Sequence, residues 1–418
     1  MKNLQFNFVS ILKWFIIILL TALSIGSATA FFLITLDFVT TWRDYHIWIV
    51  NFLPLAGLFI GLAYHFWGKE INKGNNLIIK THQNIDNSPS LKPLPIIMAP
   101  LIYMSTLLTH IAGGSAGREG TAVQIGGAIA DRCTSIFHLN ASQRKTILIM
   151  GVSAGFAAVF GTPWAGAVFG LEIMSFKKIK FENCIPSIAA AWGAHYVCLA
   201  WQVKHTIYPV HSIAPISFTT VSWSLLAGII FGIAAFLFIN TQNRFEKIFT
   251  KIKWAPLRPL IGGVIIAFII VATRNTKFIG LGIPTIVDAF YTPAGNLDFL
   301  FKILLTALTL GAGFKGGEVT PLFFIGATLG NILMGYIPLP MSILAAMGFV
   351  AVFAGATHCV IASIVLGIEL FGIPTGIFVA IASIMAYFIS GKNGIYDAKL
   401  KTGTKYDLYN FISNIKKI

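Results

Sequence analysis

The sequence predicts an all-helical protein that crosses a membrane several times. Of its 418 residues, 56% are hydrophobic and 11% are charged, and a soluble domain of this size could not bury so much apolar surface. From residue 94 onward the apolar segments differ widely in length and are often interrupted by glycine. An internal repeat also relates the two halves of the chain. Broken apolar segments in related halves are typical of membrane proteins whose irregular backbone lines a cavity.

The positive charge of the chain lies mostly in its polar connections. The formal net charge is +15, and Lys and Arg gather at 69–92, 244–258 and 392–417. Cationic loops of this kind usually remain in the cytoplasm. Since no basic stripe carries interleaved aromatic residues, we expect no nucleic-acid partner.

The N-terminal region, residues 1–45, is predicted to form an uncleaved membrane helix. Lys2 and Lys13 precede an apolar run, and residues 28–30 (Ala-Thr-Ala) resemble a signal-peptidase site. The apolar run nevertheless continues through 31–34 and is long enough to span a bilayer. We therefore expect this helix to be retained.

The rest of the chain divides into two expected membrane repeats and a tail. A second apolar segment, at 46–67, opens the first repeat, which we place at 46–245. The second repeat is expected at 246–400. A short tail without a folded regulatory domain is expected at 401–418.

Several apolar segments have lengths that do not match one bilayer crossing. Segments 121–137 and 277–290 are too short to cross at a rise of about 1.5 Å per residue, whereas 146–174 is longer than one crossing needs. We therefore expect tilted and discontinuous helices.

A Gly-rich stretch at 113–117 is followed by two adjacent ionisable residues, Arg118 and Glu119. Because glycines propagate a helix poorly, we expect a loop that opens a helix at Glu119-Gly120-Thr121. The free N–H groups at a helix start form an anion site. A carboxylate there would occupy the site itself until it is protonated or displaced, so Glu119 is predicted to be a gate.

The internal repeat places this stretch opposite a second one. At an offset of 200, Gly117, Ile125 and Gly126 match Gly317, Ile325 and Gly326. At an offset of 197, the matching residues are Met150, Gly151, Ala154, Phe156, Ala157, Ala165, Val168, Gly170 and Glu172 with Met347, Gly348, Ala351, Phe353, Ala354, Ala362, Val365, Gly367 and Glu369. Repeats of this size place a site at the interface between the halves. We therefore expect the helix start at Glu119 to face the helix start near 316–321, while the matches alone leave open whether the halves are inverted or parallel.

Two other interpretations of the Gly-rich stretch remain open. Residues 113–117 fit the G-x-S-x-G nucleophile elbow, so an intramembrane hydrolase using Ser115 is a remote alternative. That motif needs a strand before the serine, whereas a membrane-type apolar segment precedes it here, and no Asp-then-His order completes a triad nearby. Arg118 and Glu119 are alternatively a structural ion pair that locks two helices.

The remaining polar residues of the apolar segments have structural interpretations. Glu172 and Glu369 occupy equivalent places near helix ends, where we expect hydrogen-bonded structural carboxylates. The histidines show no metal-ligand spacing (His195, His205, His211 and His358), and we expect neither a metal nor a cofactor. The cysteines show no paired spacing (Cys133, Cys184, Cys198 and Cys359), and three lie in apolar surroundings, so we expect buried thiols.

The ordered motifs of the chain resemble the CLC family of chloride channels and proton-coupled anion transporters. The resemblance rests on Gly117-Arg118-Glu119-Gly120-Thr121, on Gly316-Gly317-Glu318-Val319-Thr320-Pro321, and on Tyr396 near the end. It spans residues 50–400 and implies a homodimer in which each subunit has its own pore, formed by two inverted repeats of many tilted helices. It also implies that Glu119 is the gating glutamate and that the other site residues bind the anion: Gly117, Arg118, Gly120, Glu318, Val319 and Thr320.

Two further site residues follow from the same resemblance. Residues 74–78 (Gly-Asn-Asn-Leu-Ile) occupy the place of the first filter motif, so Asn75 stands where a serine hydroxyl usually holds the anion. Tyr396 matches the inner-gate residue whose phenol donates to the anion. Without the resemblance, Tyr396 would be interpreted as an interfacial anchor.

Departures from the chloride-type motifs resemble the bacterial fluoride-exporting branch of the family, which exchanges fluoride for protons. Thr121 replaces the usual proline, Asn75 replaces the filter serine, and Glu318 and Thr320 replace apolar residues. Fluoride is small and strongly hydrated, so a site that removes its water must supply strong donors. Asn75, Thr320, Tyr396 and backbone amides can supply them.

The resemblance therefore implies fluoride export in exchange for protons, not an enzymatic reaction. A chloride/proton antiporter and a passive chloride channel of the same fold are the alternatives. The expected partners are fluoride or chloride, protons, the lipid bilayer and a second copy of the chain, in a bacterial inner membrane with both termini cytoplasmic. The internal proton-transfer glutamate of chloride exchangers is expected near Lys204-His205, where the sequence has no acid. Either the proton takes another path or coupling is absent.

Overall fold

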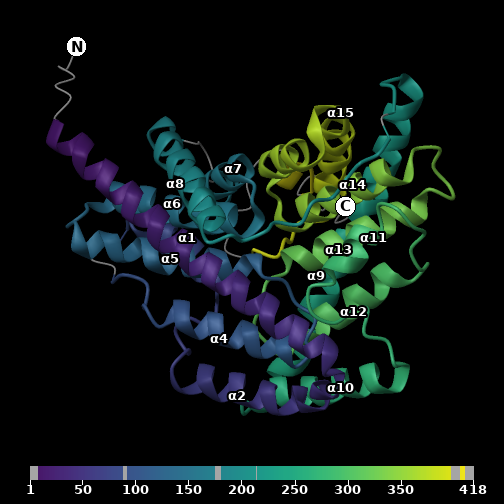
Figure 1. Cartoon of the computed structure of the whole chain (residues 1–418), viewed down its shortest axis with the longest axis horizontal. Coiled ribbons are helices and arrows are strands. Elements are labelled where there is room, and N and C mark those ends of the chain that lie inside the picture. The colour runs from purple at the N-terminus through teal and green to yellow at the C-terminus, as the bar shows by residue number, and fades with distance from the viewer. Residues whose placement is uncertain (1–7, 88–91, 175–179, 213, 397–404, 410–418) are drawn as a thin grey trace, which may run out of the picture.

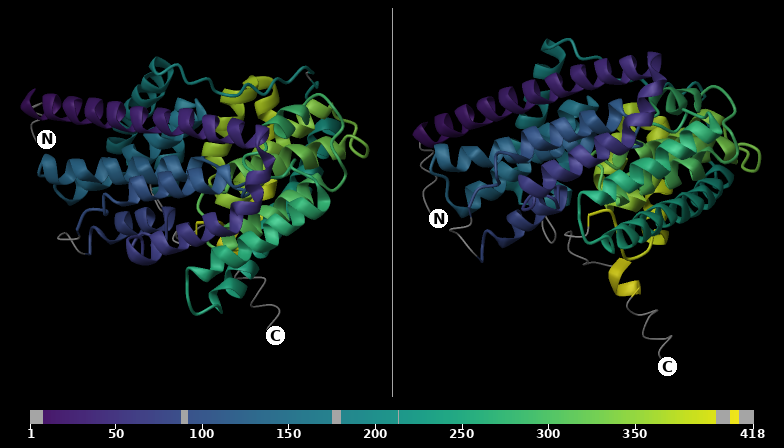
Figure 2. Two further views of the ribbon diagram at one scale, coloured as in Figure 1. Left: turned by 60° about the horizontal axis from the view of Figure 1, so that its bottom comes forward. Right: turned by 90° about the horizontal axis from the view of Figure 1, so that it is seen from below.

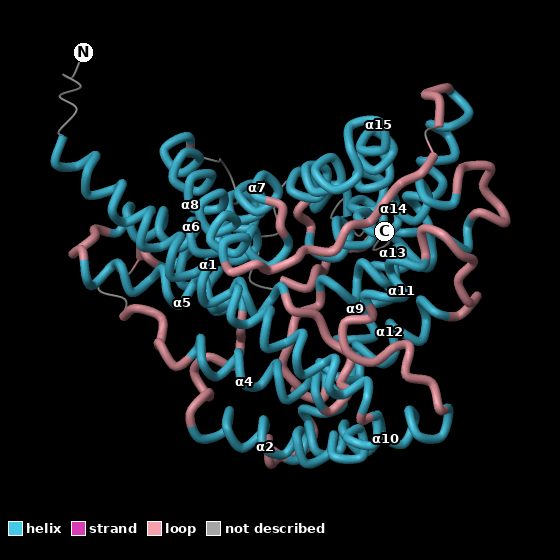
Figure 3. Tube along the Cα trace, viewed as in Figure 1, coloured by secondary structure: helices cyan, strands magenta, loops and turns pink. Residues whose placement is uncertain are grey.

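The computed structural model describes residues 8–87, 92–174, 180–212, 214–396 and 405–409 (Figure 1). In these ranges the regular structure is helical, as Figure 3 shows, and the predicted all-helical fold is confirmed. In chain order the helices are α1 (Phe8–Tyr45), η1 (Ile47–Phe52), α2 (Leu53–Phe66), α3 (Asn75–Asn84), α4 (Met98–Ile111), α5 (Glu119–Ile136), α6 (Ala141–Phe160), α7 (Pro163–Met174), α8 (Phe181–Ala200), α9 (Phe218–Thr250), α10 (Leu257–Thr273), α11 (Ile283–Asp288), α12 (Asp298–Gly311), α13 (Val319–Leu333), α14 (Met341–Thr357) and α15 (Val360–Ile389).

The helices have the uneven lengths that the sequence predicts. Among the described residues, four segments are long and apolar enough to cross a membrane: α1, η1 with α2, α9 and α15. Shorter apolar helices accompany them, namely α4, α10, α13 and α14. In Figure 2, α1 lies along one side of the molecule with α5 and α6 beneath it.

The first helix runs through the signal-like sequence without a break. α1 has 38 residues and includes residues 28–30. Thr29 and Ala30 are fully buried against the rest of the protein. The signal-like residues thus belong to a continuous, packed helix, and residues 1–7 lie outside the described part of the chain. That this helix is retained stays a prediction.

The long apolar segment 146–174 is not one helix. α6 ends at Phe160, Gly161 adopts a left-handed φ of 78°, and α7 begins at Pro163. Glycine adopts this φ readily, and proline favours the first turn of a new helix. The short segment 277–290 contains only the six-residue helix α11.

The order of the helices repeats along the chain. Long α1 and α9 each precede a similar series, in which α4 and α12, α5 and α13, and α6 and α14 correspond. The pair α7 and α8 corresponds to α15, which bends at Gly372. Our boundary between the repeats, at 245/246, falls inside α9 and is therefore misplaced. The helix order places this boundary before α9.

Glycines shared by the two repeats let their helices touch. A Cβ atom on Gly126 of α5 would overlap the Gly151 carbonyl of α6, and one on Gly326 of α13 would overlap the Gly348 carbonyl of α14. Small residues allow such close backbone contact between membrane helices. The repeated glycines therefore lie at two equivalent helix crossings, α5 with α6 and α13 with α14.

Each half also supplies a carboxylate to a helix start in the other half. Glu369 of α15 accepts from the N–H groups of Trp164 (3.2 Å) and Ala165 (2.9 Å) in α7. Glu172 of α7 accepts from the N–H groups at the start of α15, Ile361 (3.2 Å) and Ala362 (2.7 Å). The expectation of hydrogen-bonded structural carboxylates is confirmed. We call this arrangement the exchanged glutamate caps.

The free thiols follow the prediction in part. Cys133, Cys198 and Cys359 are buried, while Cys184 is partly exposed. Among the tail residues 401–418, only 405–409 are described.

Candidate functional site

The starts of α5 and α13 meet at the centre of the molecule. The Gly117 N–H donates to the Gly317 carbonyl at 2.6 Å, and the Gly317 N–H donates to the Gly117 carbonyl at 2.7 Å. Equivalent residues of the two repeats thus pair reciprocally, as a two-fold relation between the halves requires. The prediction that these two helix starts face each other is confirmed.

Glu119 lies at this junction and binds both helix starts. Its carboxylate accepts from the Thr320 hydroxyl at 2.6 and 2.7 Å, from the Thr320 N–H at 3.1 Å and from the Arg118 N–H at 3.2 Å. The residue is 1% exposed. A negative charge at two helix N-termini is favoured by their free N–H groups and dipoles. The Glu119 carboxylate therefore occupies the position where an anion would be stabilised.

Arg118 precedes α5 and binds the Glu119 carboxylate more closely through its backbone N–H than through its side chain. Its Nε lies 3.8 Å from the Glu119 carboxylate, and this buried Nε has no hydrogen-bond partner among the described residues. The side chains are thus close enough for an ion pair, but the short bonds of Glu119 go to Thr320. The interpretation as a structural ion pair does not account for those bonds.

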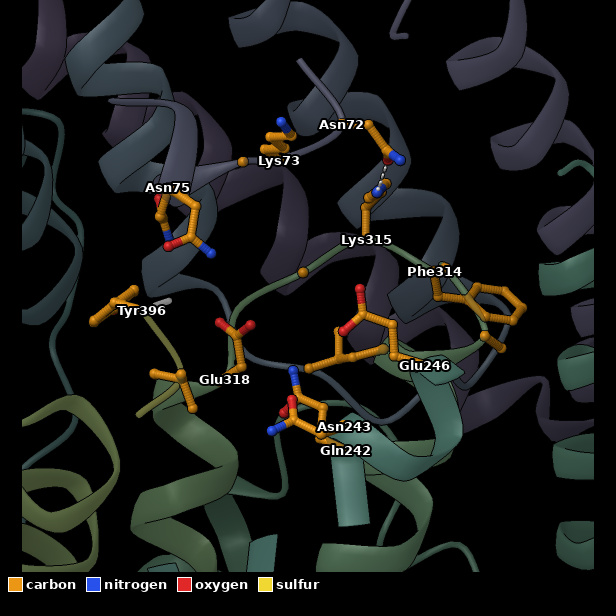
Figure 4. Close-up of a pocket in the computed structure, with 18 of the residues that line it drawn as sticks. Asn72, Lys73, Asn75, Gln242, Asn243, Glu246, Phe314, Lys315, Glu318 and Tyr396 are labelled. Atoms are coloured by element: carbon orange, nitrogen blue, oxygen red, sulfur yellow. Dashed lines mark hydrogen bonds between the residues drawn. The ribbon is translucent and has the colours of Figure 1, made fainter. Parts of the chain in front are cut away.

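A cavity of about 530 Å³ opens beside the junction. Asn75, Glu318 and Tyr396 line it, and these three residues come from α3, from the turn before α13 and from the segment after α15 (Figure 4). Segments far apart in the sequence therefore bring three of the predicted site residues together.

Asn75 is the first residue of α3, where Gly74 adopts a positive φ of 52° before the helix. A methyl group on Gly120 would lie 3.2 Å from Asn75 Nδ2 and 3.8 Å from Glu318 Oε2. The Asn75 Oδ1 is buried without a hydrogen-bond partner in the described structure. Gly120 thus keeps open the space between an amide donor and a second carboxyl group.

The other predicted residues of the α13 start also lie at the junction. Val319 and Thr320 are the first two residues of α13, and both are buried. Thr121 of α5, which stands in place of a proline, bonds the Thr106 hydroxyl of α4 at 2.8 Å. A proline would lack the hydroxyl that makes this bond.

Comparison with known proteins agrees with this geometry. A family model, the voltage gated chloride channel, matches residues 56–391. The chain belongs to this family. It is 45% identical over 396 residues to a chloride/fluoride channel protein of Pseudomonas syringae pv. tomato, covering 93% of this chain and 86% of that protein.

Solved structures of this family share the fold of the chain. The crystal structure of a CLC-type fluoride/proton antiporter matches with a TM-score of 0.89 and 30% identity, over 95% of this chain and all (100%) of that one. A slow cyanobacterial Cl⁻/H⁺ antiporter shares the fold at a TM-score of 0.79 and 17% identity, over 97% of this chain and 98% of that one. The chain is therefore an integral, multi-pass membrane protein with the CLC fold of tilted helices in two inverted repeats.

Within the CLC fold, Tyr396 is buried rather than interfacial. It is 6% exposed, and its ring packs edge-on against Phe169 at a centroid distance of 6.3 Å. An interfacial anchor would keep its hydroxyl at the membrane surface. Tyr396 instead lines the cavity together with Asn75 and Glu318.

Sequence reasoning missed several polar residues of the cavity. Gln242 and Glu246 of α9 line it, and Lys315 donates to Asn72 at 2.7 Å. A signal for the first two was present, since they lie four residues apart near the end of a long apolar helix. The position near Lys204, where the family resemblance implies an acid, lies in the irregular connection after α8.

Ser115 does not have the setting of a nucleophile. The element before it is the helix α4 rather than a strand. Its hydroxyl bonds Thr306 at 2.9 Å, and its N–H donates to the Thr309 hydroxyl at 3.2 Å. The serine thus joins the Gly-rich loop to α12, and the hydrolase alternative lacks the strand that a nucleophile elbow requires.

Proposed function

We propose that this protein transports anions across the membrane and exports fluoride in exchange for protons, with Glu119 as gate and proton carrier. The observation that carries the proposal is the position of the Glu119 carboxylate on both helix starts, at 2.6 to 3.2 Å from four donor contacts. The named functions of the Pseudomonas relative and of the matching antiporter structure support it.

The geometry gives a reason for coupling. While ionised, Glu119 is the anion of its own site and blocks it. A protonated Glu119 no longer competes for the same donors, so a fluoride ion can take its place. Release of the proton on the other side returns the carboxylate to the site. Because the Glu119 carboxylate and the fluoride ion alternate at the same donors, movement of fluoride is coupled to protonation of Glu119.

The donors around the cavity favour a small, strongly hydrated anion. The Asn75 amide, the Thr320 hydroxyl and the Tyr396 phenol can replace part of the fluoride hydration shell, together with backbone N–H groups of Arg118, Gly120 and Val319. The predicted site residue Gly117 instead uses its N–H to join the two helix starts. A carboxyl group beside an anion is unfavourable when ionised. Glu318 therefore suits a site that handles protons as well as anions.

The family fold supports further parts of the proposal. We expect a homodimer in which each subunit carries its own pore, in the inner membrane of a bacterium. Basic loops at 244–258 and the basic C-terminal region favour a cytoplasmic position for both termini. These three expectations concern the oligomeric state of the protein, the membrane in which it lies and its orientation there.

A chloride transporter or passive channel is the second candidate, because the Pseudomonas relative is named a chloride/fluoride channel protein. Flux measurements on purified protein in liposomes separate the candidates. An antiporter that exports fluoride moves fluoride rapidly, chloride slowly, and protons in the opposite direction, which changes the external pH. Fluoride flux without proton movement would identify a channel, and comparable chloride flux would identify a chloride transporter.

A further inference from the structure

Two polar side chains of α9 line the cavity and have no part in the proposed anion site. Gln242 and Glu246 lie four residues apart and therefore on one face of the helix. Both line the same cavity as Glu318, as Figure 4 shows. Ionisable side chains in membrane helices usually mark an ion or proton path.

Gln242 shares the cavity with Glu318. Its side-chain Oε1 is buried without a hydrogen-bond partner in the described chain. An amide can donate through its NH₂ group to a carboxylate or, when turned over, accept through its oxygen from a carboxylic acid. Gln242 can therefore hold Glu318 in place whether or not Glu318 carries a proton.

Basic side chains also line the cavity. The ionisable groups that line the cavity besides Glu246 are Tyr64, Lys73, Lys80, Arg258, Lys315, Glu318 and Tyr396. In Figure 4, Lys73 and Lys315 lie above Glu246, Glu318 lies beside it, and Gln242 lies below the two carboxyl groups. Basic side chains attract an entering anion, while a carboxylate attracts a proton.

We propose that Glu246 takes protons from the inner solution and passes them to Glu318, while Gln242 positions the accepting carboxyl. This step rests on the proposed function. The O–H bond of protonated Glu246 breaks, the proton moves through water in the cavity, and an O–H bond forms on the Glu318 carboxylate. Glu246 is left as a carboxylate, which the inner solution protonates again. A polar cavity of about 530 Å³ is large enough to hold such water.

The relay predicts that replacing Glu246 by a residue without a transferable proton slows transport, and that the slowing depends on pH. In full-length protein reconstituted into liposomes, fluoride efflux and proton uptake are measured together between about pH 5 and about pH 8. We expect Glu246→Gln to slow both fluxes roughly 100-fold or more at the upper end of this pH range, as the loss of a positioned proton donor does. The defect should disappear at the lower end, because solution protons then reach Glu318 directly.

Two variants show whether the proton itself matters. Glu246→Asp keeps a transferable proton and should recover most of the rate at the upper end. Glu182→Gln removes an exposed carboxylate of α8, whose side chain is 60% exposed, and should change neither flux.

Three outcomes would overturn the relay. Wild-type rates in Glu246→Gln would exclude it, and so would an equal slowing at every pH, which indicates a structural role. If the unmodified protein moves fluoride without protons, the proposed function fails in that control and the relay fails with it. Since this control is measured before any variant, the two failures are distinguishable.

Discussion

At the scale of single residues, Glu119 combines two tasks in one carboxyl group. It blocks the anion site while ionised and carries the proton when it is neutral. Replacing it by glutamine keeps the shape and removes the exchangeable proton. We therefore expect Glu119→Gln to abolish proton movement while anion movement continues, as measured by external pH and fluoride efflux in liposomes.

Glu182 of α8 offers a control for this experiment, because its side chain is 60% exposed. Glu182→Gln should leave proton coupling unchanged. Proton transport at the normal rate in Glu119→Gln would contradict the assignment of Glu119 as the proton carrier.

The phenol of Tyr396 is expected to contribute a single donor. Tyr396→Phe removes one hydrogen bond to a charged ion and should weaken fluoride binding by about 1.5–3 kcal/mol. Isothermal titration with fluoride would measure this loss, and thermal unfolding would show that the fold is intact. Unchanged binding and transport would leave Tyr396 with a packing role against Phe169.

Asn75 is expected to set selectivity. A buried polar group that is imperfectly paired loses about 1–3 kcal/mol, which separates two anions by roughly ten- to a hundredfold. The unmodified protein should therefore move fluoride well and chloride poorly, and Asn75→Ser should reduce the difference. The ratio of the two efflux rates measures this effect. A ratio near one in the unmodified protein would contradict the fluoride assignment.

At the scale of helices, the exchanged glutamate caps make the end of one repeat depend on the other. Glu369→Ala removes both acceptor bonds at the start of α7. We expect a loss of about 1–2 kcal/mol in the free energy of unfolding, the usual cost of losing a cap and its favourable interaction with the helix dipole. Thermal unfolding in detergent would measure it.

The equivalent variant in the other repeat is the matched comparison. Glu172→Ala should destabilise the start of α15 by a similar amount, because its two acceptor distances are similar. The exposed Glu182→Ala variant should have little effect. A stable Glu369→Ala protein would show that the cap contributes little to the folded state.

At the scale of the whole molecule, the sequence allowed the general architecture and the meeting of the two helix starts to be predicted. Hydropathy identified the apolar helices, because membrane burial imposes long apolar runs. It missed the polar helix α3, which lies in the segment 69–92 interpreted as a polar connection. The repeated glycines identified the site, because Gly117 and Gly317 pair directly and no larger residue fits between their loops. These features follow from local constraints on the backbone.

The parts that could not be predicted depend on distant contacts. The boundary between the repeats was misplaced because the basic segment 244–258 begins inside α9, which continues to Thr250. The roles of Gln242 and Glu246 were missed because only folding places them beside Glu318. The bonds from Thr320 to Glu119 likewise join residues 201 positions apart, and no local pattern encodes that distance.

The exchanged glutamate caps also determine how long the first half of the nascent chain must wait for its capping residue. Glu369 follows Ala165, which it caps, by 204 residues. At about 5–20 residues per second, a ribosome needs roughly 10–40 s to make that stretch. During this interval the first half lies in the membrane with an uncapped α7 and with Gly117 lacking its partner. The period in which cellular proteases and insertion factors can act on the nascent protein is therefore determined by the separation of the repeats, and a longer connection between them would lengthen it.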